Sequence, residues 1–376
     1  MNSKSLDKIK EKEEQDFPLF NPFKYRLTMI SSEKTNDYVV DLKVLKNGQI
    51  AVLLRYNYLN LYKYNNKIEL KLSIETKKRN ISFCQLSNED IVICYDLLEM
   101  EIIKLIEKNK YKTILITKIR NNIFNYQKYP YFKVVEIKNN LFMTIFRNCC
   151  GKSFRLWKLN NGLNYEFVTE IRGNLMYNAL KLNRKEFAVL EVRYYRIHEG
   201  FKKFWFSPIL KFYNSNNYKL LKEIKLNDLE YKSHFPKRDY NSTYENICLI
   251  NKDLLCVGFD CKGMNLIKIS THECIKYINY YEEPIKDIYI FNTSSIIKFS
   301  KNLFIVCGRF DLLIIYKYER DKENMKKKLF LKKGDFCCKL NDEIFIIYKD
   351  KSFSLWNLKY SKFRPLSMNI KKNTKV

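Results

Sequence analysis

Glycine and proline are scarce in this sequence, with 9 Gly and 7 Pro among 376 residues. This excludes collagen-like chains and glycine-rich linkers. No apolar run reaches the roughly 18 residues that a membrane-spanning helix needs. The first 16 residues are rich in Lys, Glu and Asp, so we expect neither a membrane span nor a secretory signal peptide. Because 46% of residues are apolar and 15% aromatic, a large packed core is expected.

Residues suited to metal binding and catalysis are few and scattered. There are three His and 11 Cys, and no Cys-x-x-Cys pair. The nearest zinc candidates, Cys256, Cys261, His272 and Cys274, match no common zinc spacing. Neither a serine nucleophile elbow nor a phosphate-binding glycine loop occurs. We therefore expect no catalytic residues, no metal and no cofactor. The odd number of cysteines fits a reducing compartment, the cytoplasm or the nucleus.

The sequence has a large excess of positive charge. Lys and Arg number 69 against 41 Asp and Glu, which gives a formal net charge of +28. Such an excess favours polyanionic partners, with an affinity that falls steeply as salt rises. However, the excess is mostly Lys, and Lys, Asn and Ile are abundant together. Their codons are A/T-rich, so a low-GC genome explains the same bias without a functional basic surface.

Short runs of β-branched and aromatic residues recur along the whole chain, which predicts strands. They form a repeated unit of strand, polar turn, apolar strand, second turn and a third strand ending in a large apolar or aromatic anchor. The anchors are Tyr62, Ile103, Trp157, Tyr213, Ile267, Tyr316 and Trp356. A fourth strand follows six of them, at 68–75, 111–118, 165–172, 218–226, 274–280 and 327–333. Four antiparallel strands repeated seven times predict an all-β, seven-bladed β-propeller.

The repeat also explains the polar turns and several cysteines. Asn, Asp and Gly recur before each second strand, as in 46–49 (KNGQ) and 251–253 (NKD), and these residues tolerate tight turns. Cys84, Cys248 and Cys338 occupy a first-strand position that other units fill with Val, Leu or Ile. A position shared by these residue types predicts packing rather than reactivity.

The two ends of the repeat array are expected to meet in one blade. The seventh unit has no fourth strand, while residues 23–30 precede the first unit without a blade of their own. An open ring would leave unpaired strand edges, so we expect residues 23–30 to form the outer strand of the last blade. The predicted domains are a charged, mobile leader at 1–16, the propeller at 23–360 and a Lys-rich tail at 361–376.

Across residues 23–360 the chain resembles degenerate WD40-like propellers, in particular those with seven blades. Trp157 and Trp356 stand where that family often has the Trp of its Trp-Asp pair, and Lys158 and Asn357 follow them here. Kelch propellers carry a Gly pair in each blade, which 9 Gly do not allow. The WD40 resemblance implies a non-catalytic protein–protein interaction platform or scaffold, with other proteins as partners.

Three long insertions share one predicted face of the propeller. They are the connections 117–131 and 227–244, and a long hairpin in unit four that turns at Glu199-Gly200. Long loops on a rigid scaffold commonly carry function, and Arg, Tyr and Trp are enriched at binding hot spots. The candidate binding residues are Arg120, Tyr129, Arg193, Tyr194, Tyr195, Arg196, Lys203, Trp205, Lys237 and Arg238.

Two alternatives remain for these residues. In the structural alternative, the hairpin aromatics pack on a neighbouring blade and the Lys side chains are only solvated. In the functional alternative, the interleaved cations and rings bind an acidic partner or nucleic acid, as in proteins that bind single strands. The sequence carries no motif of a dedicated nucleic-acid module.

Overall fold

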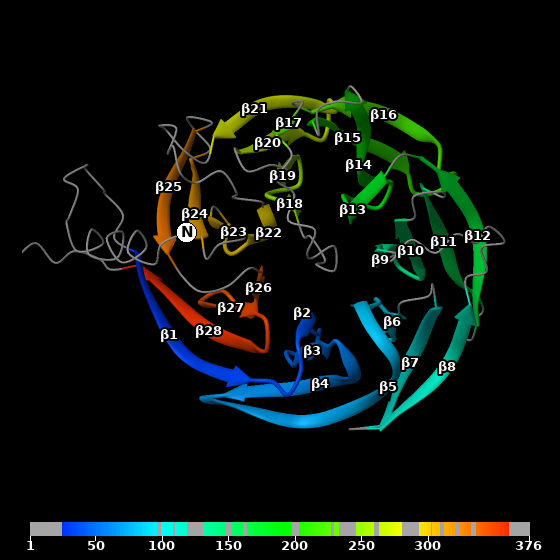
Figure 1. Ribbon diagram of the computed structural model, residues 1–376, viewed down its shortest axis with the longest axis vertical. Coiled ribbons are helices and arrows are strands. Elements are labelled where there is room, and N and C mark those ends of the chain that lie inside the picture. The colour runs from blue at the N-terminus through cyan, green and yellow to red at the C-terminus, as the bar shows by residue number, and fades with distance from the viewer. Residues whose placement is uncertain are drawn as a thin grey trace, which may run out of the picture.

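All the secondary structure that is described consists of β-strands. The computed structural model describes residues 25–95, 99–107, 110–118, 131–147, 152–160, 164–173, 175–197, 203–226, 229–232, 246–258, 263–279, 293–301, 303–308, 312–319, 324–331 and 336–360. Their sheets stand around a common centre, and strands such as β2, β9, β13, β18, β22 and β26 lie innermost (Figure 1). This part of the chain holds no helix with the length and apolar content that a bilayer span needs. The predicted all-β, seven-bladed propeller is confirmed.

The seven blades follow one another along the chain. Blades 1 and 2 comprise β2 (Val39–Val44), β3 (Ile50–Leu54), β4 (Tyr56–Asn65), β5 (Lys67–Gln85), β6 (Ile91–Tyr95), β7 (Glu99–Glu107) and β8 (Lys110–Lys118). Blades 3 and 4 comprise β9 (Tyr131–Lys138), β10 (Leu141–Arg147), β11 (Lys152–Asn160), β12 (Asn164–Arg172), β13 (Leu175–Lys181), β14 (Glu186–Ile197), β15 (Lys203–Asn214), β16 (Leu220–Lys225) and β17 (Leu229–Lys232). Blades 5 and 6 comprise β18 (Ile247–Leu249), β19 (Leu254–Gly258), β20 (Gly263–Lys268), β21 (Glu273–Asn279), β22 (Thr293–Lys298), β23 (Leu303–Gly308), β24 (Leu312–Glu319) and β25 (Asn324–Leu331). Blade 7 comprises β26 (Phe336–Lys339), β27 (Ile344–Lys349), β28 (Ser352–Tyr360) and β1 (Tyr25–Lys34).

Strand β5 belongs to two blades at once. Its first part pairs with β4 as the outer strand of blade 1, and residues 80–85 pair with β6 as the inner strand of blade 2. The repeat predicts two strands here, and the structure joins them into one element of 19 residues. Blades 1 and 2 therefore form a single seven-stranded sheet.

The core lies between neighbouring blades. Seven clusters of buried side chains each join two adjacent blades. The second strands supply much of this core, and β3, β6 and β19 are buried along their whole length. One cluster packs Leu42 and Ile50 of blade 1 against Ile346 and Phe353 of blade 7. The first and last blades are thus in apolar contact, as a ring of blades requires.

The N-terminal strand β1 lies in the sheet of blade 7. It pairs antiparallel with β28 from Tyr25 opposite Tyr360 to Lys34 opposite Ser352. Leu27 packs with Trp356 against the cluster between blades 6 and 7. Of the predicted closing segment 23–30, residues 23 and 24 lie outside the described part, and the observed pairing extends further, to Lys34. The predicted leader 1–16 and tail 361–376 also lie outside it.

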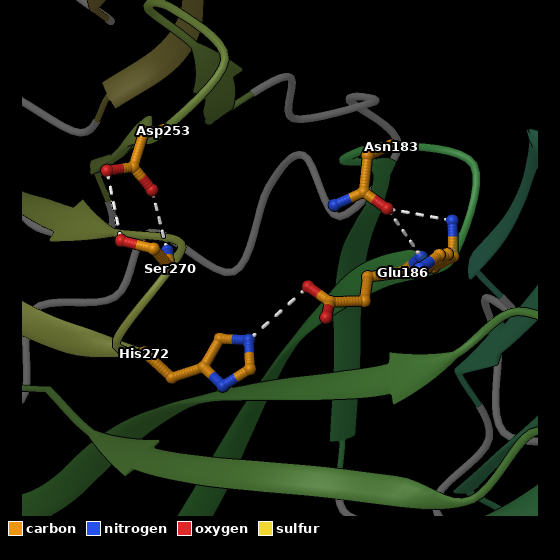
Figure 2. A network of polar contacts seen from close by, with 6 residues as sticks. Asn183, Glu186, Asp253, Ser270 and His272 are labelled. Atoms are coloured by element: carbon orange, nitrogen blue, oxygen red, sulfur yellow. Dashed lines mark hydrogen bonds and ion pairs between the residues drawn. The ribbon is translucent and has the colours of Figure 1, made fainter.

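The polar turns form one end of the blades, which we call the turn face: it carries the connections from first to second and from third to fourth strands. Gly48 in the turn of blade 1 adopts φ +80°, which glycine tolerates best. In blade 4, the Asn183 side chain accepts hydrogen bonds from the amides of Lys185 (2.7 Å) and Glu186 (3.0 Å) (Figure 2). Such Asn-capped turns confirm the predicted hairpin signal.

Polar contacts on the turn face also join blades 4 and 5. The Glu186 carboxylate lies 3.4 Å from His272 Nε2 (Figure 2). The imidazole ring also packs at a tilt against the Phe212 ring, with 4.3 Å between the ring centroids. Within blade 5, Asp253 accepts hydrogen bonds from the amide (2.6 Å) and hydroxyl (3.0 Å) of Ser270. His272 thus serves as a contact between blades, and Asp253 as the support for its turn.

The eight cysteines of the described residues are all free. Cys84, Cys248 and Cys338 lie in inner strands and are buried or half-buried, as the shared packing position predicts. Burial raises the pKa of the thiols of Cys84, Cys94 and Cys256. These thiols stay protonated near neutral pH and are poor nucleophiles. Cys149, Cys150 and Cys261 lie outside the described residues.

Candidate interaction face

The end of the blades opposite the turn face carries the longer connections, and we call it the loop face. Successive strands of a blade are antiparallel, so consecutive connections alternate between its two ends. The loop face therefore holds the connections from second to third strands and those from each outer strand to the next inner strand. The long hairpin of blade 4 belongs to it, whereas residues 119–130 and 233–244 of the other two predicted insertions lie outside the described residues.

The hairpin of β14 and β15 in blade 4 extends beyond the outer strand of that blade. β14 and β15 pair without interruption from Glu186 opposite Asn214 to Ile197 opposite Lys203, which confirms the predicted hairpin. The outer strand β16 covers β15 only from Ile209 to Tyr213. Beyond it, β17 pairs with residues 203–206 of β15. The hairpin is therefore extended as a three-stranded sheet of β14, β15 and β17, which we call the hairpin extension.

The hairpin extension contains six of the predicted binding residues. Its register sets Tyr194 opposite Phe206, and Arg196 opposite Phe204. The six are Arg193, Tyr194, Tyr195, Arg196, Lys203 and Trp205. The other four, Arg120, Tyr129, Lys237 and Arg238, lie outside the described residues. A binding role for all ten stays a prediction.

A second group of loop-face residues was missed by the sequence analysis. It lies where blades 7 and 1 meet and consists of Tyr38, Arg55, Tyr56 and Lys351; we call it the junction patch. The Tyr38 and Tyr56 side chains are 44% and 48% exposed. Arg55 lies over both rings, 5.9 Å from the centre of Tyr38 and 5.7 Å from that of Tyr56. Lys351 lies 5.1 Å from the Tyr38 ring centre.

Backbone hydrogen bonds hold the segments of the junction patch together. The backbone amide of Thr35 donates to the carbonyl oxygen of Lys351 (2.8 Å). In the same way, the amide of Arg55 donates to the carbonyl of Tyr38 (2.8 Å), and the amide of Asn80 to the carbonyl of Arg55 (2.9 Å). Asn80 is buried and also donates from its side chain to the carbonyl of Leu54 (2.7 Å). Blades 7, 1 and 2 are thereby tied together at this position.

Asp37 fixes the connection that carries Tyr38. Its carboxylate accepts hydrogen bonds from the amides of Tyr38 and Tyr56, both at 2.7 Å. Both carboxylate oxygens are thus engaged by backbone, and the carboxylate joins two segments that are far apart in the sequence. A signal for this site existed in the exposed aromatic pair Tyr56 and Tyr58 at the start of a third strand. The contact between Lys351 and Tyr38 could not be predicted from the sequence, because it depends on blade 7 lying beside blade 1.

Replacing Asp37 by Ala is expected to lower the free energy of unfolding by about 1 kcal/mol, since two backbone amides lose their acceptor. Asp342 on the turn face offers a matched control: its exposed carboxylate pairs only with Lys339 among the described residues. Asp342→Ala should change the stability by less than about 0.5 kcal/mol. Urea unfolding of the two variants measures both values. Equal effects would mean that Asp37 does not organise the junction.

The described residues contain no candidate metal site. No group of three or more His, Cys, Asp or Glu side chains among them lies close enough to hold a metal ion. The buried tyrosines Tyr95 and Tyr165 donate hydrogen bonds to Glu101 and Asp90, respectively. Burial raises the pKa of both hydroxyls well above the usual range, so they act as structural donors.

Comparison with known proteins identifies the fold. No protein-family model matches the chain, and no curated protein matches it. The crystal structure of the WD40 beta propeller domain of Doa1 is similar, with a TM-score of 0.52 and 10% identity, over 90% of this chain and 98% of that one. The crystal structure of Saccharomyces cerevisiae Sqt1 is similar with a TM-score of 0.57 and 10% identity, over 88% and 99% of the two chains. The fold of this chain is therefore that of a WD40-like β-propeller.

Proposed function

We propose that this protein is a non-catalytic protein-interaction platform, whose partner docks on the loop face at the hairpin extension of blade 4. The observation that carries the proposal is the third strand of that extension. Among the described blades, only blade 4 has a fifth strand, and β17 pairs with β15 beyond the outer strand β16. Strands β13 to β16 already make a four-stranded blade like the other described blades, and β17 is added to it.

The residue types of the extension support a protein partner. Arg, Tyr and Trp dominate binding hot spots because they combine large apolar area with hydrogen-bonding groups. An extension with three paired strands is more rigid than a single loop, and a preformed surface loses less entropy on binding. The fold alone does not assign this function, since propellers serve many roles.

The alternative function is binding of a polyanion or nucleic acid at the same face. The net charge of +28 favours it, because a basic chain attracts polyanions. The two functions differ in how binding responds to salt. Charge-driven binding weakens steeply between about 150 and 500 mM salt, whereas a mainly apolar protein interface is far less sensitive.

Trimming residues 193–206 to a two-residue turn is expected to leave the propeller folded and to reduce partner capture by at least about 10-fold. The remaining residues of β14 and β15 still pair with β13 and β16. Pull-down with the tagged full chain and the trimmed chain, at both salt concentrations and with nuclease, measures the effect. A variant with only Tyr195→Ser and Trp205→Ser separates the side chains from the backbone.

Each outcome of this pull-down is informative. An unchanged partner set would place the binding site elsewhere. Failure of the trimmed chain to fold would mean that the extension packs on a neighbouring blade. Loss of capture at high salt or with nuclease in the full chain would favour the polyanion function.

We propose a cytoplasmic or nuclear location. The free state of the eight described cysteines supports a reducing compartment.

A further inference from the structure

Arg55 and Lys351 of the junction patch are two cations for which the described part of the chain offers no carboxylate partner. Within the described residues, the interactions of both side chains are with tyrosine rings, Arg55 with Tyr38 and Tyr56, and Lys351 with Tyr38. Asp37, the carboxylate built into this junction, has both oxygens occupied by backbone amides. The guanidinium and ammonium hydrogens therefore remain available to an anionic ligand.

The two cations are also held in place. Both lie within 6 Å of the same ring centre, that of Tyr38. The backbone around them is fixed by hydrogen bonds between blades 7, 1 and 2. Stacking and a fixed backbone reduce the entropy that a long charged side chain loses on binding. A pair of positioned cations on an exposed surface is suited to a ligand with two neighbouring negative charges.

The arrangement favours carboxylates over nucleic-acid bases. Proteins that bind single strands offer open aromatic faces on which bases stack. Here Arg55 and Lys351 already lie over the Tyr38 ring and Arg55 also lies over the Tyr56 ring, so less ring surface is left for a base. What the patch presents is the planar fork of Arg55, which matches a carboxylate in two-point geometry, and the point charge of Lys351.

We propose that the junction patch binds an acidic peptide segment, whose neighbouring carboxylates pair with Arg55 and Lys351. The inference rests on the proposed function in one respect: the segment belongs to a protein partner that docks on the loop face. Charge complementarity supports it, because a chain with net charge +28 attracts acidic segments over long range. It also disfavours a second copy of this chain as the occupant.

A labelled peptide of alternating Glu and Ser tests the proposal, with the Gln–Ser peptide as its neutral counterpart. Fluorescence anisotropy with the full chain measures both affinities. Replacing Arg55 and Lys351 together by Ala should weaken binding of the Glu peptide by about 10-fold or more, since two charge-assisted contacts are lost. Arg55→Lys keeps the charge and loses the fork, and should weaken it by about 3-fold.

The chain offers a matched control on the opposite face. Arg184 and Lys185 are exposed residues of a turn in blade 4. Their replacement by Ala removes the same two charge types, and should weaken binding by less than about 2-fold. Equal losses in the two double variants would show that overall charge attracts the peptide, which overturns the proposal. Equal binding of the Gln peptide would also overturn it.

A thymidine oligonucleotide of the same charge tests the other class of ligand. We expect both double variants to weaken its binding to the same small extent. If it binds more tightly than the Glu peptide and loses affinity selectively without Arg55 and Lys351, the patch is a nucleic-acid site and the proposal fails. The trimmed hairpin variant should bind the peptide normally, so failure of the patch and failure of the hairpin as the docking site are distinguished.

Discussion

Replacement of Lys211 by Met is expected to lower the free energy of unfolding by about 3–5 kcal/mol. Lys211 lies on β15 between two carboxylates, with Nζ 2.9 Å from Glu191 Oε2 on β14 and 3.8 Å from Glu223 Oε2 on β16. The Glu191 side chain is completely buried. Without Lys211, this negative charge would lose the ammonium group at 2.9 Å in a medium that solvates it poorly.

The tight packing around Glu191 makes relaxation difficult. A Cβ added at Gly173 would come within 2.6 Å of Glu191 Oε1, so the backbone of the neighbouring segment approaches the carboxylate closely. The carboxylate therefore has little room to turn toward water. Glu223→Gln removes only the more distant and more exposed partner, and should cost less than about 1 kcal/mol.

Chemical denaturation of three variants separates the charge effect from the loss of packing. The double variant Glu191→Gln with Lys211→Met should recover more than half of the loss, because no buried charge remains. If the free energy of unfolding of Lys211→Met lies within about 1 kcal/mol of that of the parent chain, the ion pair does not stabilise blade 4. If the double variant is no more stable than Lys211→Met alone, the loss of stability comes from the lost packing of the Lys211 side chain.

Removal of β1 is expected to destabilise the propeller by more than about 4 kcal/mol. The deletion of residues 25–34 exposes the whole edge of β28, whose residues from Ser352 to Tyr360 pair with it. It also removes Leu27 from the cluster between blades 6 and 7. An unpaired edge strand is prone to associate with other chains, so aggregation should rise as well.

Two further measurements make the β1 experiment decisive. A synthetic peptide of residues 25–34, added to the shortened chain, should restore much of the stability by completing the blade. Met29→Ser changes an exposed side chain of the same strand, and should alter stability by less than about 0.5 kcal/mol. If the shortened chain has the same free energy of unfolding as the full chain, β1 does not stabilise the ring.

The blades could be predicted from the sequence because their determinants are local and repeated. Six of the seven anchors are buried in the structure and Trp356 is half-buried, each in the third strand of its blade. The Asn-containing turns are equally local, since Asn183 bonds to amides two and three residues further on. Seven copies of weak signals in one register are sufficient to define the architecture.

Features that depend on contacts between distant segments could not be predicted. The connection 227–244 is rich in polar and charged residues, and β17 forms there because β15 extends beyond β16 and offers it a free edge. The junction patch requires Lys351 to lie over Tyr38, which are far apart in the sequence. Both are set by tertiary pairing rather than by local propensity.

Hydroxyl-radical footprinting of the full chain, with and without the protein partner recovered by pull-down, tests the central claim most directly. That claim is that binding occurs on the loop face. We predict protection in the loop-face segments 35–38, 55–58 and 193–206, and no change at the exposed residues Phe167 and Leu220 of the outer strands. Protection of the outer strands, or of the turns 46–49 and 183–186 on the turn face, with the loop-face segments unchanged, would contradict it.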